Sequence, residues 1–172
     1  SGQNDAQQCS IGRKLAFVLH GLWPQYEDGW PQYCSNEELP YGIEEDYAGL
    51  FPSDKLYDHE WEKHGTCSGL SPEGYFDLSA LIKESVVIPP AYQSPEEPFR
   101  TTAEDLQEAF TLANPDFDPE TVAVRCSSSG RYLKELFVCF EKDGDPRPCS
   151  DEILKNAARS CGRDDFLVRN IR

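Results

Sequence analysis

The spacing of apolar residues changes along this chain, and the changes predict where strands and helices lie. Residues 14–22 form a short apolar run rich in strand-forming side chains, so they predict a strand. Residues 121–126 and 132–141 have the residue types of strands, and the Ser/Gly-rich turn between them predicts a hairpin. Residues 165–171 predict a closing strand near the end of the sequence.

Helical spacing dominates the middle of the chain. Residues 54–64, 72–86 and 102–113 each predict a helix, and 151–160 predict a shorter one near the end. Residues 87–99 contain four prolines and therefore exclude a long helix there. Strands at both ends with helices between them indicate the α+β class rather than alternating βαβ units.

Length and composition support one globular domain. The 172 residues are 38% hydrophobic, so residues 1–172 are expected to fold as a single domain with a real core. No apolar run approaches the length of a bilayer span, and we expect no membrane partner.

Cysteine content and net charge indicate the cellular location of the protein and the partners it can bind. Seven cysteines without a CxxC pair predict disulfides rather than a zinc ribbon or redox motif, which indicates a secreted protein, or one of a vacuolar or periplasmic lumen. The alternative is a cytosolic protein with buried free thiols. The odd count leaves at least one thiol without a partner in the chain. A net charge of −15 opposes binding to nucleic acid unless the binding surface is locally cationic.

Two of the three histidines lie in one short string, HEWEKHGTC at residues 59–67. On a helix, His59, Glu60, Lys63 and His64 occupy one sector, while Trp61 points elsewhere and can anchor the helix in the core. The alternative is a solvated helix face with ion pairs four residues apart. The scarcity of histidine elsewhere in the chain favours a functional cluster.

A metal site fits this string poorly. The zinc-protease helix has histidines four residues apart, whereas His59 and His64 are five apart and Lys63 would repel a dication. We therefore expect no metal and no cofactor. The third histidine, His20, follows the first apolar run, and alone it is equally consistent with a structural histidine. Trp23 can belong to the core or stack on a flat ligand.

Taken together, FVLHGLWPQ and HEWEKHGTC resemble the two active-site segments of the ribonuclease T2 family, the S-like acid endoribonucleases. The strings GWPQYC and YFDLSALI extend the resemblance. It implies a central antiparallel sheet flanked by helices. It also implies metal-independent cleavage of single-stranded RNA, in which the 2′-hydroxyl attacks phosphorus to give a 2′,3′-cyclic phosphate, with low base specificity and an acidic pH optimum.

The resemblance implies a role for each residue of the two strings. His64 resembles the general base, His20 the general acid and His59 the phosphate-binding histidine. Glu60 and Lys63 match the pair that supports the pentacovalent phosphorane. The chemistry agrees, because imidazole titrates near pH 6.5 and serves either as acid or as base.

Base contacts are implied for the residues after His20. Trp23 matches the family's base-site tryptophan, and Gln25 and Tyr26 are further candidates. Stacking contributes about 1–3 kcal/mol per base and tolerates any base, which suits broad specificity. The expected partner is RNA and not DNA, which lacks the 2′-hydroxyl, and the expected state is a monomer.

The family's cysteine pattern implies three disulfides, Cys34–Cys67, Cys126–Cys161 and Cys139–Cys149. The same pattern implies that Cys9 has no partner in this chain, because in the family that partner lies just upstream, after an N-terminal strand whose SWSP-like string does not occur in this sequence. One hypothesis is that an N-terminal peptide stays associated through Cys9. An alternative function is a catalytically impaired binding or storage protein on the same scaffold, although retention of all five motif residues argues against it.

Overall fold

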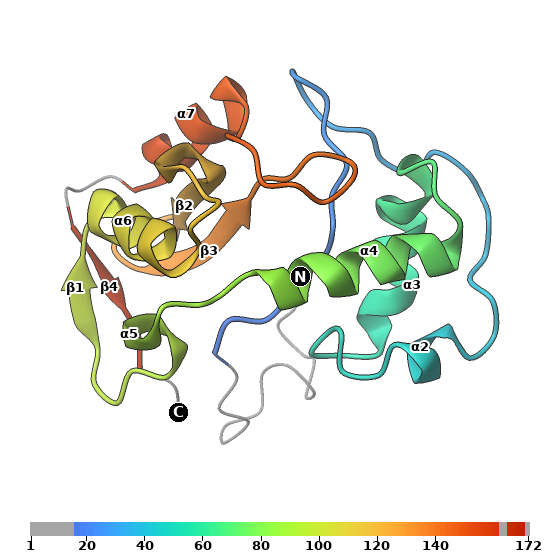
Figure 1. Ribbon diagram of the computed structural model, residues 1–172, viewed down its shortest axis with the longest axis horizontal. Helices are drawn as coiled ribbons and strands as arrows, with labels where there is room; N and C mark the ends of the chain where they lie inside the picture. Colours follow the sequence, from blue (N-terminus) through green and yellow to red (C-terminus); the bar gives the residue numbers. More distant parts are fainter. Residues whose placement is uncertain (1–15, 162–164, 171–172) are drawn as a thin grey trace. The chain divides into compact units, whose positions relative to one another are not determined.

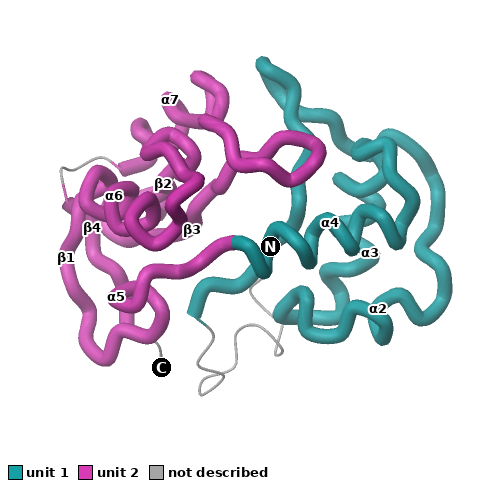
Figure 2. Tube along the Cα trace, in the orientation of Figure 1, with its two compact units in different colours: residues 1–85, 172 teal, residues 86–171 magenta. Residues whose placement is uncertain are grey.

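The computed structural model describes residues 16–161 and 165–170 (Figure 1). Cys9 lies outside these residues. The chain divides into two compact units, Ser1–Ser85 with Arg172, and Val86–Ile171 (Figure 2). The single domain expected from the length of the chain stays a prediction.

The described part of the first unit is built from helices. They are α2 (Ile43–Asp46), α3 (Lys55–Lys63), a short 3₁₀ helix (Gly65–Cys67) and α4 (Pro72–Ser85). The sequence predicted α3 and α4 to within one residue at each end. Gly69, with φ 78°, adopts the left-handed conformation that turns the chain between the 3₁₀ helix and α4.

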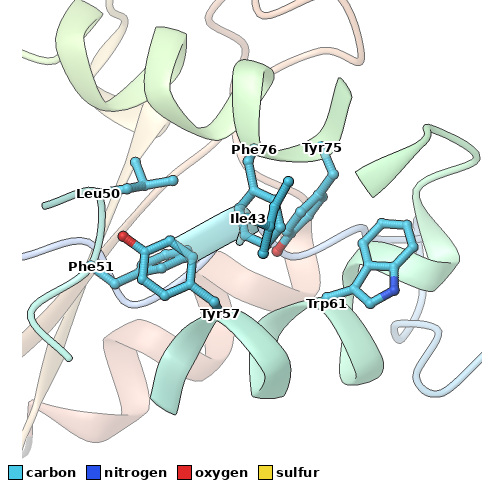
Figure 3. Close-up of a cluster of buried hydrophobic side chains, with 7 residues drawn as sticks. All are labelled: Ile43, Leu50, Phe51, Tyr57, Trp61, Tyr75 and Phe76. Atoms are coloured by element: carbon cyan, nitrogen blue, oxygen red, sulfur yellow. The ribbon is translucent and has the colours of Figure 1, made fainter. Parts of the chain in front are cut away.

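An aromatic core joins these helices (Figure 3). Its buried members are Ile43, Leu50, Phe51, Tyr57, Trp61, Tyr75 and Phe76. Trp61 is fully buried, as the helical spacing predicted, and its indole N–H donates to the Glu37 carbonyl at 2.8 Å. Burial of each large side chain contributes about 1.5–3 kcal/mol, so this cluster fixes how α3 lies against α4.

The second unit combines strands and helices (Figure 1). Its elements are α5 (Pro90–Gln93), β1 (Phe99–Thr101), α6 (Ala103–Ala113), a 3₁₀ helix (Pro119–Thr121), β2 (Val122–Cys126), β3 (Leu133–Val138), α7 (Asp151–Ser160) and β4 (Phe166–Val168). Strands β2 and β3 form the predicted antiparallel hairpin, and β1 pairs with β4, also antiparallel. Helices α6 and α7 both pack against β2, which is why nearly every residue of that strand is buried.

Helix caps explain why the predicted boundaries in this unit are accurate. The Thr102 hydroxyl accepts from the Asp105 backbone N–H at 3.0 Å, and α6 begins at the next residue, Ala103. The Ser150 hydroxyl accepts from the Ile153 N–H in the same way at the start of α7. A capping side chain satisfies one of the unpaired donors of the first turn, so the sequence marks where each helix starts.

Among the residues that the structure describes there are three disulfides, Cys34–Cys67, Cys126–Cys161 and Cys139–Cys149. They are the same pairs that the family resemblance implies. Cys34–Cys67 closes a long loop in the first unit, and the other two lie in the second unit.

The α+β class is confirmed, with two differences in detail. The strand predicted over residues 14–22 is wrong for its described part, because residues 16–22 have no regular secondary structure. A strand needs a neighbour that completes its hydrogen-bond ladder, and no described strand pairs with this segment. The described strands form two separate two-stranded sheets rather than one, and β1, for which no strand was predicted, begins at the last residue of the proline-rich segment 87–99.

Candidate active site

Helix α3 positions four of the predicted site residues. Glu60 and His64 are buried, with 3% and 4% of their surface exposed, whereas His59 is exposed and Lys63 is half-buried. His64 is the C-cap residue, directly after the last helical residue Lys63, and its backbone N–H donates to the Glu60 carbonyl at 3.0 Å. The sector predicted for these four residues therefore spans the boundary between solvent and core.

Trp23 comes from a distant segment and contacts both buried groups. Its indole Nε1 donates to Glu60 Oε2 at 2.7 Å. Its ring stacks on the His64 imidazole with the ring centroids 5.2 Å apart and the planes at 27°. The base-stacking candidate is thus in direct contact with two residues of the HEWEKHGTC string.

Burial moves the pKa values of the two buried groups in opposite directions. It raises the pKa of Glu60 to about 7, against the hydrogen bond from Trp23 and the charge of Lys63, which lower it. It lowers the pKa of His64 to about 4, and the positive charges of Lys63 and His59 lower it further. The pKa of His59 is also lowered, first by partial desolvation of its ring and then by the charge of Lys63, although the residue is exposed. Near pH 5, His64 is therefore a neutral proton acceptor while Glu60 is a neutral acid.

His20 lies on the segment that carries Trp23. It is exposed, and it makes no hydrogen bond, ion pair or ring contact with any residue that the structure describes. Leu19 and Leu22 on either side pack against the aromatic core, and the Tyr75 hydroxyl donates to the Leu22 carbonyl at 2.8 Å. The His20 ring is therefore presented to solvent from a backbone that is held against the same core as α3.

The two further base-contact candidates are exposed and do not join the buried cluster. Gln25 is exposed, and 62% of the Tyr26 surface is accessible. The Tyr26 backbone N–H donates to the Gly29 carbonyl at 3.0 Å, which places both residues at a surface turn.

The loop after this turn is tied to the end of α3. The disulfide Cys34–Cys67 joins it to the 3₁₀ helix, and the Tyr33 N–H donates to the Lys63 carbonyl at 3.0 Å. A third link runs from the Cys34 N–H to the Thr66 hydroxyl at 3.2 Å. These bonds hold the backbone on both sides of His64.

One contributor was missed by sequence reasoning. A side chain at Gly21 would overlap Glu60 Oε2 and would place its Cβ 2.6 Å from Trp23 Nε1. Glycine between His20 and Trp23 therefore makes room for the buried carboxyl group. Its place inside the first motif string was the only available signal, because contacts between segments so far apart leave no local pattern.

Comparison with known proteins identifies the family of this chain. Residues 2–149 match the Ribonuclease T2 family. The chain belongs to the ribonuclease T2 family. A ribonuclease of Aeromonas hydrophila is 42% identical to it over 179 residues, which cover 98% of this chain and 78% of that protein.

Solved structures of related fold agree with the α+β assignment. A mutant of ribonuclease MC1, an enzyme from bitter gourd seeds, was solved in complex with 5′-UMP and matches with a TM-score of 0.69 at 20% identity, covering 88% of this chain and 82% of that one. The S-like ribonuclease trichomaglin matches with a TM-score of 0.63 at 21% identity, covering 77% of this chain and 74% of that one.

Proposed function

We propose that this T2-family protein is an endoribonuclease that cleaves single-stranded RNA by attack of the 2′-hydroxyl on the adjacent phosphorus. The observation that carries the proposal is the pair of buried groups, Glu60 and His64, in a chain of this family. Their pKa values, about 7 for Glu60 and about 4 for His64, leave Glu60 a neutral acid and His64 a neutral base at acidic pH. That combination suits general acid–base chemistry on a polyanion below neutral pH.

Each side chain then has a chemical role. His64 accepts the 2′-hydroxyl proton, since its lowered pKa keeps its imidazole unprotonated down to about pH 4. His20, exposed to solvent, protonates the leaving 5′-oxygen. The charge that develops on the phosphorane oxygens needs donors, and Lys63 supplies one as an ammonium group.

Glu60 and His59 complete the phosphate site. Below pH 7 the Glu60 carboxyl is protonated, so one oxygen accepts from Trp23 while the hydroxyl donates to a phosphate oxygen. His59, which is exposed, binds phosphate when protonated, and its lowered pKa confines that form to acidic pH. Both effects support an acidic pH optimum.

The proposal also covers metal independence, base specificity and cellular location. The 2′-hydroxyl is the nucleophile, so the reaction proceeds without metal and does not act on DNA. Exposed Gln25 and Tyr26 contact bases loosely, which supports low base specificity. Three disulfides favour an oxidising location, outside the cell or in a vacuolar or periplasmic lumen. The monomer, and a peptide held through Cys9, stay predictions.

Incubation with RNA in EDTA at about pH 5 tests the proposal. We expect fragments with 2′,3′-cyclic phosphate ends from the wild type, and no fragments from His64→Ala or from a DNA substrate. Binding of RNA without cleavage would favour the impaired scaffold instead, and a requirement for divalent metal would refute the mechanism.

A further inference from the structure

The backbone before Trp23 is held in place by the aromatic core. Leu19 and Leu22 pack against the aromatic core, and Tyr75, which is fully buried on α4, donates its hydroxyl to the Leu22 carbonyl. Although this segment has no regular secondary structure, its path over the core is set by these contacts. The Trp23 side chain therefore starts from a held backbone rather than from a free loop.

The Trp23 indole makes two different contacts at once. The N–H in the ring plane donates to Glu60 at 2.7 Å, and the ring face stacks on His64 with the centroids 5.2 Å apart. A side chain that stacks on a base needs only the flat face of its ring for that contact. The directional bond from its edge to a buried carboxyl group is not required for that role.

No hydrogen bond from a described residue orients the His64 imidazole at its Nδ1 atom. Its Nδ1 is buried and has no hydrogen-bond partner among the residues that the structure describes. Catalytic imidazoles are usually oriented by a hydrogen bond at the nitrogen that does not react. Here the stacked indole is the contact that restricts the plane of the ring.

We propose that Trp23 is a positioning residue, whose N–H holds the Glu60 carboxyl group and whose ring holds the His64 imidazole in their working orientations. Gly21 is part of the same arrangement, because any side chain there would push Glu60 and Trp23 apart. This inference rests on the proposed function, and it deepens it by giving Trp23 a role that acts through two catalytic residues.

The role differs from base stacking in what it predicts for kinetics. Loss of a base-stacking surface weakens substrate binding and raises KM. Loss of a positioning contact misplaces groups that act on the reacting atoms, and a misplacement of about 1 Å can lower kcat about 100-fold.

The Glu60 titration provides a second readout. The charged and titratable groups that act with Glu60 are Lys63 on the same helix and Tyr75 on α4, whose pKa is raised first by burial and then by the Glu60 charge. The neutral Trp23 N–H acts on Glu60 as a hydrogen-bond donor. Of these contacts, Trp23→Phe removes only the indole hydrogen bond to the Glu60 carboxyl. Because that bond favours the ionised form, its loss raises the Glu60 pKa above its wild-type value.

The experiment compares Trp23→Phe, which keeps a ring and loses the N–H, with Gly21→Ala, which keeps the indole. Steady-state kinetics on a dinucleotide substrate give kcat and KM, and carbon NMR of labelled carboxyl groups gives the Glu60 pKa. We expect kcat to fall about 10- to 100-fold with KM little changed, and the Glu60 pKa to rise, in both variants. Trp61→Phe is the matched control, since it also loses a buried indole N–H bond, to the Glu37 carbonyl. It should lower stability and leave the Glu60 pKa unchanged.

A rise in KM alone, or an unchanged Glu60 pKa in Trp23→Phe and Gly21→Ala, overturns the inference. If Trp23→Phe fails to fold, Gly21→Ala decides the question, because its indole is intact. If the wild type does not cleave RNA, the proposed function fails, while the NMR titration still tests whether Trp23 holds Glu60.

Discussion

Substitution of Glu60 by Gln should make the stability of the protein less sensitive to alkaline pH. Glutamine keeps the side-chain length and a carbonyl oxygen for the Trp23 N–H, but it does not ionise. In the wild type, the raised pKa of Glu60 means that folding favours the protonated form. Its contribution to stability is therefore fully present below the unfolded value of 4.5 and is lost as the pH rises through about 7.

The magnitude follows from those two pKa values. Ionising a carboxyl group that is only 3% exposed, with a pKa of about 7 rather than 4.5, lowers the free energy of unfolding by about 3 kcal/mol between pH 4 and pH 8. His64 has the opposite dependence, because its lowered pKa removes stability as the pH falls from 6.5 towards 4. That contribution is present in both proteins and cancels in their difference.

Urea unfolding of the wild type and Glu60→Gln at several pH values measures this difference. All three tryptophans, at positions 23, 30 and 61, lie in the first unit, so their fluorescence reports the unit that contains Glu60. The midpoint of Glu60→Gln relative to the wild type should rise by about 1–3 M urea from pH 4 to pH 8. A relative midpoint that is independent of pH would show that Glu60 titrates normally and would refute the reasoning.

Three further predictions concern neighbouring groups. Lys63→Gln removes a charge that lowers the pKa of His64, so the acid limb of the pH–rate profile, expected near pH 4, should move to higher pH; a stationary limb would contradict the assignment of His64 as the base. Replacement of both Cys34 and Cys67 by Ser opens a loop with a sequence separation of 33, and denaturant unfolding should show a loss of about 4 kcal/mol; a change below about 1 kcal/mol would argue against the bond. In Gly65→Ala the new methyl group would overlap the Trp61 ring, so thermal unfolding should show a loss of about 1–3 kcal/mol, and an unchanged melting temperature would show that this packing is loose.

Local sequence patterns were sufficient for most helices. Helix α3 was predicted to within one residue at each end, because its apolar spacing and the glycine after it are local signals. The same spacing correctly placed Trp61 in the core. It did not separate exposed His59 from buried Glu60, since the position of the solvent boundary depends on what packs against the helix.

Long-range contacts were outside the reach of these patterns. The bond between Trp23 and Glu60 joins residues 37 positions apart, and nothing local to either residue indicates it. The strand expected over 14–22 failed for a similar reason. Strand-forming side chains predict a strand only where a neighbouring strand completes the ladder, and residues 16–22 pack their leucines on helices instead. The disulfide pairs came from the family pattern, since seven cysteines alone leave many pairings open.

We propose above all that the 2′-hydroxyl of RNA is the group that attacks phosphorus. An RNA oligonucleotide carrying a single 2′-O-methyl nucleotide, digested in EDTA at about pH 5, tests this most directly. We expect cleavage at every phosphodiester except the one that follows the modified sugar. Cleavage at that bond would show that another nucleophile attacks phosphorus and would contradict the mechanism.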